Sequence, residues 1–377
     1  MADTKEKKAV AKNGKTGITL PTGDHFRNAQ LDLFQSFLCN TEDERDRLSN
    51  TIDLWDSLPK YAVSRQAMTK LRKDGGFLEL LELEFKYKSK EFQVVIQSAR
   101  IKDHDGVTQD YYPGANEELV EDALRKIAAD QNQGYFDSQD FRSGVVFSLY
   151  MLRKELAKRG HTRSYQEIIE SVRILSGSMI EIRSPPGEEM KAFSRANYFP
   201  ALAAVSKHKL DQDPSARWVV QFHPLVTQSI NALTYRQYNY HQMMSHSTQL
   251  ARWLYKQLSL KYIFANYDNS FSIQYSRIKR DSAMINYTRE RDGISAVDNA
   301  FQELQEHSVI SRFAKEYVRG HRGKIEEVLY VVYPSAEFVR EMKAANKRGQ
   351  GAVSSNNKRA LPGGSARADF KPASRSS

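Results

Sequence analysis

The stretch SYQEIIESVRILSGSMIEIR, residues 164–183, is the most informative for the fold. Ser164 and Glu167 have the spacing of a capping box, in which each side chain accepts a hydrogen bond from the other residue's backbone amide. Ile168, Val172 and Leu175 follow at i, i+4 and i+7, which predicts an amphipathic helix. The alternating residues 179–182 then predict the first strand of a hairpin. The stretch therefore predicts a capped helix followed by a β-hairpin.

The residues on both sides of this stretch extend the pattern. Phe147 to Arg159 predicts an amphipathic helix closed by Gly160, because glycine readily adopts the left-handed conformation that ends a helix. Residues 184–187 form the expected turn of the hairpin, and a second pair of strands turns at residues 211–214. Helix, turn, helix and hairpin is the order of a winged helix.

The same order recurs downstream. Residues 245–260 predict a helix, residues 271–283 a short second helix, and a third helix begins at Arg289. Residues 309–319 and 324–333 then predict a hairpin around a glycine-rich turn. We therefore predict an α+β fold with two tandem winged-helix domains and disordered N- and C-terminal tails. Earlier in the chain we expect a hairpin near residues 87–90 and a helix over residues 114–129.

Composition narrows the class of protein. The chain has 377 residues, 40% of them hydrophobic, and its apolar runs are too short to span a membrane. We find no signal peptide and a single cysteine, Cys39, which excludes a disulfide framework and favours a reducing bacterial cytoplasm. The nine histidines contain no His-x-His pair, and there is no phosphate-binding glycine loop. We expect no metal, no cofactor and no enzymatic activity.

The positive charge is unevenly distributed. The net charge is +10, with +3 in residues 1–29, +4 in 235–343 and +6 in 344–377, whereas residues 30–234 carry −3. An excess of cations in the tails and the C-terminal third favours a polyanionic partner, and nucleic acid is the usual one. Ordinary solvated charge is the alternative.

The second helix of a helix-turn-helix enters the major groove, so the third helix of the downstream unit supplies the main candidates. Arginine suits guanine, and asparagine or glutamine suits adenine. The preceding helix and the hairpin turn carry cations suited to phosphates. The DNA-binding candidates of this unit are Arg289, Arg291, Ser295, Asn299 and Gln302, then Arg277, Lys279 and Arg280, and at the hairpin Arg319, Arg322 and Lys324.

The equivalent helix of the upstream unit is less suited to DNA. Its candidates are Arg163, Ser164, Gln166 and Arg173, but Glu167 and Glu170 lie among them and weaken a close approach to phosphate. We interpret this surface either as a secondary DNA contact or as a protein–protein surface.

A short peptide precedes the predicted folded part. Gln30, Leu31, Asp32, Leu33 and Phe34 follow a lysine-rich leader and precede an acidic segment. Leu33 and Phe34 would fill an apolar pocket while the Gln30 amide makes an oriented hydrogen bond, which is how short linear motifs gain affinity. The first turn of an amphipathic helix is the alternative. The five residues resemble the pentapeptide that bacterial replication proteins insert into the sliding clamp.

Over residues 30–335 the chain resembles iteron-binding plasmid replication initiators, among them the TrfA-like proteins. The resemblance rests on the pentapeptide, the helices and strand within 147–182, the helix containing Trp253 and Tyr255, and residues 289–310 with the hairpin after them. It implies an initiator that binds direct repeats in double-stranded origin DNA and opens the adjacent AT-rich DNA, which it then contacts as single strands. It also implies that the initiator recruits the host helicase and sliding clamp. Such proteins often form homodimers through the first winged helix and repress their own gene, which controls plasmid copy number.

The sequence thus divides into five predicted parts. These are a disordered basic leader (1–29), the clamp-binding peptide with an acidic linker (30–57), a first winged-helix domain for secondary DNA contact or dimerisation (58–234), a second as the main DNA reader (235–343), and a disordered basic tail (344–377).

Two other classes of protein are alternatives to an initiator of this kind. A rolling-circle initiator would need a nucleophilic tyrosine and a metal site; Tyr235, Tyr238 and Tyr240 are candidates, but we interpret them as packing residues. A tandem winged-helix repressor without a replication role explains the DNA face equally well and leaves the pentapeptide unexplained.

Overall fold

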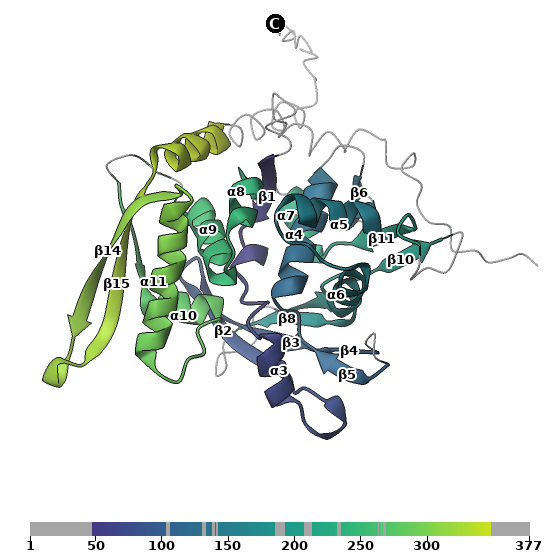
Figure 1. Cartoon of the computed structure of the whole chain (residues 1–377), viewed down its shortest axis with the longest axis horizontal. Helices are drawn as coiled ribbons and strands as arrows, with labels where there is room; N and C mark the ends of the chain where they lie inside the picture. The colour runs from purple at the N-terminus through teal and green to yellow at the C-terminus, as the bar shows by residue number, and fades with distance from the viewer. Residues whose placement is uncertain are drawn as a thin grey trace, which may run out of the picture.

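The computed structural model describes residues 47–347 except 103–105, 130–132, 138–139, 141, 185–192, 207–212, 232–234, 263, 265 and 267–268. The described chain mixes helices and sheets (Figure 1). The pentapeptide at residues 30–34, Cys39, the leader and the tail from residue 348 lie outside the described residues. No helix in the described part is long and apolar enough to cross a membrane.

The elements up to residue 231 are, in chain order, β1 (Leu48–Ile52), a 3₁₀ turn (Trp55–Ser57), α3 (Arg65–Leu71), a second 3₁₀ turn (Asp74–Gly76), β2 (Leu81–Tyr87), β3 (Lys90–Gln97), β4 (Ala99–Lys102), β5 (Thr108–Tyr111), α4 (Ala115–Ala129), β6 (Gly134–Asp137), β7 (Arg142–Ser148), α5 (Leu149–Lys158), α6 (Tyr165–Gly177), β8 (Met179–Arg183), β9 (Phe193–Asn197), β10 (Leu202–Val205), β11 (Arg217–Gln221) and α7 (Pro224–Asn231). The later elements are β12 (Tyr235–Asn239), α8 (Tyr240–Ser245), α9 (Gln249–Lys261), β13 (Phe271–Gln274), α10 (Tyr275–Ser282), α11 (Glu290–Glu306), β14 (Ile310–Arg319), a third 3₁₀ turn (His321–Gly323) and β15 (Ile325–Pro334).

The local predictions around residues 147–183 are confirmed. Ser164 and Glu167 form the capping box, with the Ser164 hydroxyl accepting from the Glu167 amide at 3.2 Å. Gly160 ends α5 with a φ of +86°, a conformation that glycine adopts without a steric penalty. The predicted hairpin near residue 88 is β2–β3, and Lys88 and Ser89 both have positive φ, as a tight hairpin turn requires.

The hairpin after α6 does not stand free. β8 pairs with β9 on one side and with β3 on the other, which gives a four-stranded antiparallel sheet of order β2-β3-β8-β9. β10 and β11 pair as predicted, within a second four-stranded sheet of order β10-β11-β7-β6. The strands after α6 are therefore built into sheets whose other strands come from earlier in the chain.

The downstream unit differs from its predicted boundaries in two places. The helix predicted from residue 245 begins at Gln249, because Thr248 caps it and the separate short helix α8 ends at Ser245. Residues 271–274, predicted as helix, form the strand β13, which pairs with β15. The sheet has the order β13-β15-β14; α10 and α11 pack against it, and α9 packs against α11 (Figure 1).

The predicted acidic linker is wrong for residues 48–57. β1 pairs with β12 along its whole length, and Trp55 and Asp56 are buried. The linker prediction counted the acids of this segment as solvated, whereas Asp56 is neutralised by Arg125, with oxygen–nitrogen distances of 2.8 and 2.9 Å. This segment and the start of the predicted second domain therefore form one two-stranded ribbon.

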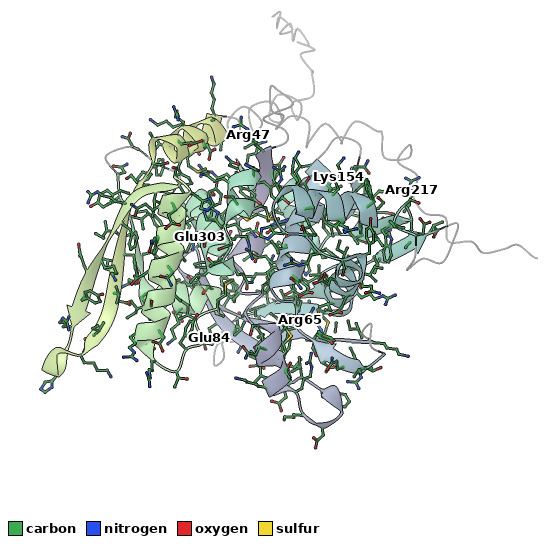
Figure 2. The ribbon with its side chains drawn as sticks, viewed as in Figure 1. Arg47, Arg65, Glu84, Lys154, Arg217 and Glu303 are labelled. Atoms are coloured by element: carbon green, nitrogen blue, oxygen red, sulfur yellow. The ribbon has the colours of Figure 1, made fainter. Side chains whose placement is uncertain are left out.

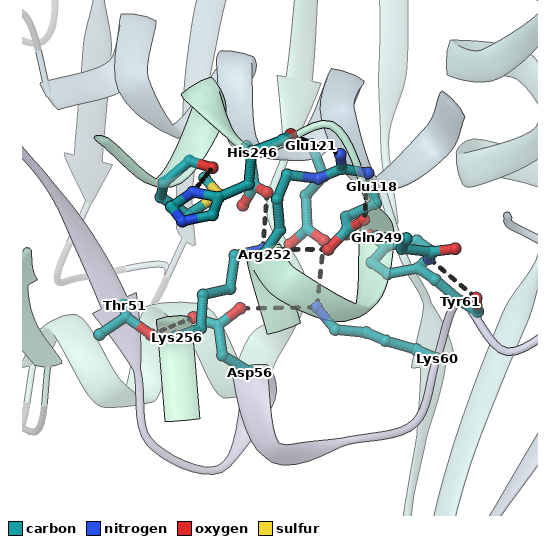
Figure 3. Close-up of polar contacts among 12 residues, drawn as sticks. Thr51, Asp56, Lys60, Tyr61, Glu118, Glu121, His246, Gln249, Arg252 and Lys256 are labelled. Atoms are coloured by element: carbon teal, nitrogen blue, oxygen red, sulfur yellow. Dashed lines mark hydrogen bonds and ion pairs between the residues drawn. The ribbon is translucent and has the colours of Figure 1, made fainter. Parts of the chain in front are cut away.

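The predicted domains at 58–234 and 235–343 also share a core. α4 was expected to bury one stripe, but its residues from Glu117 to Ala128 are all buried. α9, from the later part of the chain, is buried from Ala251 to Leu260. Charged side chains of α4 and α9 meet between them, together with residues 56 and 60 (Figure 3). We call these residues the ionic seam: Asp56, Lys60, Glu118, Glu121, Asp122, Arg125, Arg252 and Lys256.

The ionic seam is neutral overall, with four acids and four bases. Lys256 lies 2.6 Å from Asp122 and 3.5 Å from Glu118, and Arg252 lies 3.2 Å from Glu118. Burial alone would raise the pKa of Glu121, but Lys60 and Arg125 outweigh burial and lower that pKa to about 2 (Lys60 Nζ is 3.1 Å away). α9 thus supplies two cations that neutralise buried carboxylates of α4.

A final helix covers residues 336–347 and lies beside the β1–β12 ribbon (Figure 1). Phe338, Val339 and Met342 are buried in the core, and the Phe338 ring packs against Tyr255 and Tyr262. Its last four residues extend into the range predicted as a disordered tail, so that boundary is too early.

Candidate nucleic-acid interface

The outward face of α11 carries the candidates predicted to read bases. Ser295, Asn299 and Gln302 are all exposed and follow one another at i, i+4 and i+7, so they form one row along the helix. Arg289 and Arg291 are exposed at its N-terminal end. The structure therefore places Arg291, four residues before Ser295, on the same face as the row, whereas Arg289 lies at the N-cap. Two of these side chains have acidic partners on α11, since Gln302 donates to Glu306 at 3.1 Å and Arg291 lies 3.4 Å from Asp292.

The opposite face of α11 fixes its position. Val297, Phe301 and Leu304 are buried, and the Phe301 ring packs in a tilted arrangement against Tyr330 with ring centroids 5.0 Å apart. Tyr330 also donates from its hydroxyl to Asp298 at 2.9 Å. These contacts attach α11 to β15, so the helix cannot rotate about its axis without breaking them.

Close packing also holds the start of α11 against α10. A Cβ on Gly293 would lie 2.2 Å from the Tyr275 hydroxyl oxygen and 2.8 Å from Ile285, so only glycine fits this contact. The Tyr275 hydroxyl donates to Glu290 at 2.7 Å. The N-terminal turn of α11, with Arg291 on its outside, is therefore positioned by α10.

The cations of α10 differ in their availability. Arg277 is exposed. Lys279 is paired with Glu290 on α11, and Arg280 lies 2.7 Å from Asp281 within its own helix. Lys279 thus contacts α11 directly, and two of the three cations already have acidic partners.

The β14–β15 hairpin extends from the body of the protein on the side of α11 (Figure 1). Arg319 and Lys324 are exposed at its turn, and Arg319 donates to the Gly323 carbonyl oxygen at 3.1 Å. The side chain of Arg322 lies outside the described set. Tyr317, Val318 and Ile325 are large hydrophobic side chains exposed on the same hairpin.

Two cations of this hairpin were missed by the sequence analysis. Lys315 lies 2.7 Å from Asp298 and so ties the hairpin to α11. Arg312 is exposed, and its guanidinium stacks 3.7 Å from the centroid of the Tyr333 ring. The two residues are three positions apart on β14 and so lie on opposite faces of the strand; the alternation gives Lys315 the same face as Tyr317 but does not locate Arg312.

The α6 face of the upstream unit is organised differently. The Ser164 hydroxyl is used to cap α6, and Arg163 donates to the Asn116 side chain at 3.0 Å. Gln166 and Arg173 are exposed. Glu167 is exposed beside them, so this face combines one exposed cation with an acid and has two of its four candidates engaged internally.

The solved structures that resemble this chain do so distantly. Domains 2 and 3 of RctB are 10% identical with a TM-score of 0.47, and the match covers 74% of this chain and 97% of that one. The Pi initiator protein in complex with iteron DNA is 13% identical with a TM-score of 0.39, covering 64% of this chain and 98% of that one. Neither a family model nor a curated protein matches the chain. At these identities and TM-scores we base no argument on the likeness.

Proposed function

We propose that this protein is a plasmid replication initiator that binds direct repeats in origin DNA. The observation that carries the proposal is the exposed row Ser295, Asn299 and Gln302 on α11, with Arg289 and Arg291 at its start. Amide side chains can bond adenine and guanidinium groups can bond guanine, while a row of this length spans several base pairs of a major groove. The buried face of the same helix is fixed, which keeps the row in one orientation.

The element order supports a winged-helix interpretation of this unit. α9, β13, α10, α11 and the β14–β15 hairpin follow the order helix, strand, helix, helix, hairpin. In this interpretation α11 is the recognition helix and the hairpin is the wing, whose cations contact phosphates. α4, α5, α6 and the β8–β9 hairpin form the corresponding first unit, with a secondary role in DNA contact or homodimerisation.

A gel shift tests the proposal directly. The full-length chain is mixed with the DNA that flanks its own coding region, at physiological salt and with excess random competitor DNA. We expect retention of fragments that contain short direct repeats and none of repeat-free fragments of equal length. Equal binding to both would contradict origin recognition, because phosphate contacts alone carry no sequence information.

The recruiting functions rest on the pentapeptide. We propose that Leu33 and Phe34 insert into the bacterial sliding clamp and that the bound initiator opens AT-rich DNA and recruits the helicase. Replacing both residues by alanine should abolish clamp pull-down and leave repeat binding intact. A variant that still binds the clamp would contradict this role and leave the alternative, a tandem winged-helix repressor that acts on its own gene.

We propose a binding role without catalysis, in the bacterial cytoplasm. The three tyrosines that could have acted as nucleophiles, Tyr235, Tyr238 and Tyr240, are 7%, 2% and 0% exposed. Burial raises the pKa of each, which disfavours the phenolate that attacks a phosphate. Incubation of the protein with supercoiled origin DNA and divalent cations should therefore yield no nicked product.

A further inference from the structure

The outer face of α5 carries a row of side chains to which the function proposed above assigns no role. Tyr150, Arg153, Lys154 and Ala157 follow one another at i, i+3, i+4 and i+7, so they share one face of the helix, and all four are exposed. The other side of α5 buries three leucines in the core. Figure 2 shows Lys154 and Glu303 of α11 in opposite halves of the molecule. The row on α5 is therefore separate from the α11 face.

Tyr150 presents an unoccupied aromatic ring in this row. It is 55% exposed, and its side chain makes no hydrogen bond, ring contact or cation–π contact with any described residue. Its backbone amide donates to the Pro214 carbonyl oxygen at 3.0 Å, which fixes the start of the helix. The ring is therefore held at the surface, where a planar group from outside the protein can pack on it.

Two cations lie within about one helical turn of this ring. The Arg153 guanidinium packs 4.8 Å from the centroid of the Tyr165 ring, which restrains it on the surface without using a carboxylate. Lys154 makes no ion pair with any described residue. Guanidinium and ammonium groups are those that proteins use to contact phosphate. The row thus combines one aromatic ring with two available cations.

The acids of α5 and of the loop bonded to its start are already engaged. Glu155 is the one acid of α5; its side chain is 16% exposed, and it pairs with Arg159 at 3.0 Å. Asp213 precedes Pro214 and accepts hydrogen bonds from the Ser215 amide at 3.0 Å and from the Ser215 hydroxyl at 2.6 Å. A polyanion that approaches the row therefore meets positive charge with no exposed acid among the row's own residues.

An exposed aromatic ring flanked by cations is the arrangement with which proteins bind single-stranded nucleic acid, because a base stacks on the ring while the cations neutralise phosphates. In duplex DNA the bases are already stacked on one another, so the ring would find no exposed base and the cations alone would contribute. The row therefore suits an unpaired strand better than a duplex.

We propose that the outer face of α5 binds a single DNA strand, with one base stacked on Tyr150 and the adjacent phosphates contacted by Arg153 and Lys154. The inference rests on the proposed function, because an unpaired strand becomes available where the initiator opens AT-rich DNA. Every base has a planar face, so this contact does not depend on sequence. The α11 face holds the repeats while the α5 face holds the unpaired strand.

The test uses fluorescence anisotropy of the full-length chain with two labelled probes, a thymidine homopolymer and a duplex that contains the direct repeats. The homopolymer cannot pair with itself, so it reports binding of a single strand alone. Tyr150→Ala should weaken its binding on the order of tenfold, whereas Tyr150→Phe, which keeps the ring, should bind it normally. Neither variant should change the affinity for the repeat duplex.

A second variant tests the two cations. Replacing Arg153 and Lys154 together by glutamine should lower the slope of log affinity against log salt on the homopolymer by about 0.7 for each phosphate that is no longer neutralised. Lys90 is exposed on the β2–β3 hairpin, so Lys90→Gln is the matched control and should leave the slope unchanged.

The outcomes separate this inference from the proposed function. Normal binding of the homopolymer by Tyr150→Ala, an equal loss in Tyr150→Phe, or an equal loss on the repeat duplex would overturn the single-strand site. Failure of the wild-type chain to bind the homopolymer would overturn it as well. If the wild-type chain binds the homopolymer but does not distinguish repeats from random duplex, the proposed function fails and the single-strand site stands.

Discussion

The helix pairs α5–α6 and α10–α11 follow the same order along the chain and present different surfaces. α6 begins with a capping box that uses Ser164, whereas Arg289 at the N-cap of α11 makes no side-chain capping bond. The hairpin after α6 is paired into a four-stranded sheet, and the hairpin after α11 extends from the body with strands of ten residues each. Both pairs keep some polar side chains exposed, but only α11 carries three of them, Ser295, Asn299 and Gln302, in one row at helical spacing.

The comparison shows that topology alone does not assign a DNA-reading role. Glu170 of α6 is engaged by Arg65 at 3.2 Å, and Glu167 remains exposed on the same face. The row on α11 contains no acid between Arg291 and Gln302 other than Asp292 and the inward-bonded Asp298. Because α11 also carries the exposed acids Glu290, Asp292 and Glu306, the two faces differ in the row of uncharged polar side chains and not in the number of acids.

The largest expected effect comes from the ionic seam that holds both helix pairs to one core. Lys256→Met removes the cation that Asp122 and Glu118 share, leaving buried carboxylates with less compensation. We expect a decrease of about 3–5 kcal/mol in the free energy of unfolding. Denaturant unfolding measures it, with Lys154→Met on the exposed face of α5 as the control, expected to change stability by less than about 0.5 kcal/mol.

A decrease in unfolding free energy as small as that of Lys154→Met would mean that the ionic seam does not hold the upstream and downstream units together. In that case each helix pair could be produced and assayed separately, and the comparison would apply to independent domains. If Lys256→Met destabilises as expected, both pairs must be compared within the intact chain.

The next largest effect is on DNA affinity, and it distinguishes the exposed face of α11 from that of α6. Replacing Ser295, Asn299 and Gln302 together by alanine should reduce affinity for repeat DNA by roughly 1–3 kcal/mol for each residue that contacts a base edge. Replacing Gln166 and Arg173 on α6 should change it by less than that. Fluorescence anisotropy with labelled repeats measures both. Equal reductions from the two sets would show that both helices read sequence.

Variants of the β14–β15 hairpin turn should have a smaller effect on DNA affinity. Replacing Arg319 and Lys324 by alanine should lower affinity for repeat and random DNA alike, because phosphate contacts are not sequence-specific. The slope of log affinity against log salt should fall by about 0.9 for each phosphate that the variant no longer neutralises. An unchanged slope would remove the hairpin turn from the interface. Arg217 is exposed on β11 at the opposite end of the molecule from the hairpin (Figure 2), so Arg217→Ala serves as the matched surface control.

The smallest expected effect is a loss of folding stability at acid pH. Burial lowers the pKa of His246 to about 4, and the neighbouring His307 contributes in the same direction. The unfolded chain therefore binds a proton here between pH 6.5 and 4 that the folded chain does not, so stability is complete above pH 6.5 and falls as pH decreases. We expect a decrease in stability of roughly 1 kcal/mol at pH 6 from this group. His246→Gln should flatten the fall in the unfolding midpoint over this range; an unaltered profile would contradict the assignment.

Local chemistry made much of the fold predictable. Ser164 with Glu167, Gly160 and the Lys88–Ser89 turn act on their immediate neighbours, and each was located from sequence. The burial of residues 48–57 was not, because Asp56 reads as a solvated acid until Arg125 is known to lie beside it. The all-round burial of α4 was missed for the same reason, since Lys256 is more than a hundred residues away. The exposure of Ser295, Asn299 and Gln302 was predictable because α11 has one strong apolar stripe, which leaves the other face exposed; their role in reading bases stays a prediction.

The measurement that tests the central claim most directly compares the wild-type chain with Arg291→Ala on two DNAs, one containing the direct repeats and one of random sequence. If α11 reads bases, the affinity of the variant falls by on the order of 1–3 kcal/mol on the repeats and by little on random DNA. Equal decreases on both would assign Arg291 to phosphate contact and contradict the reading role of α11.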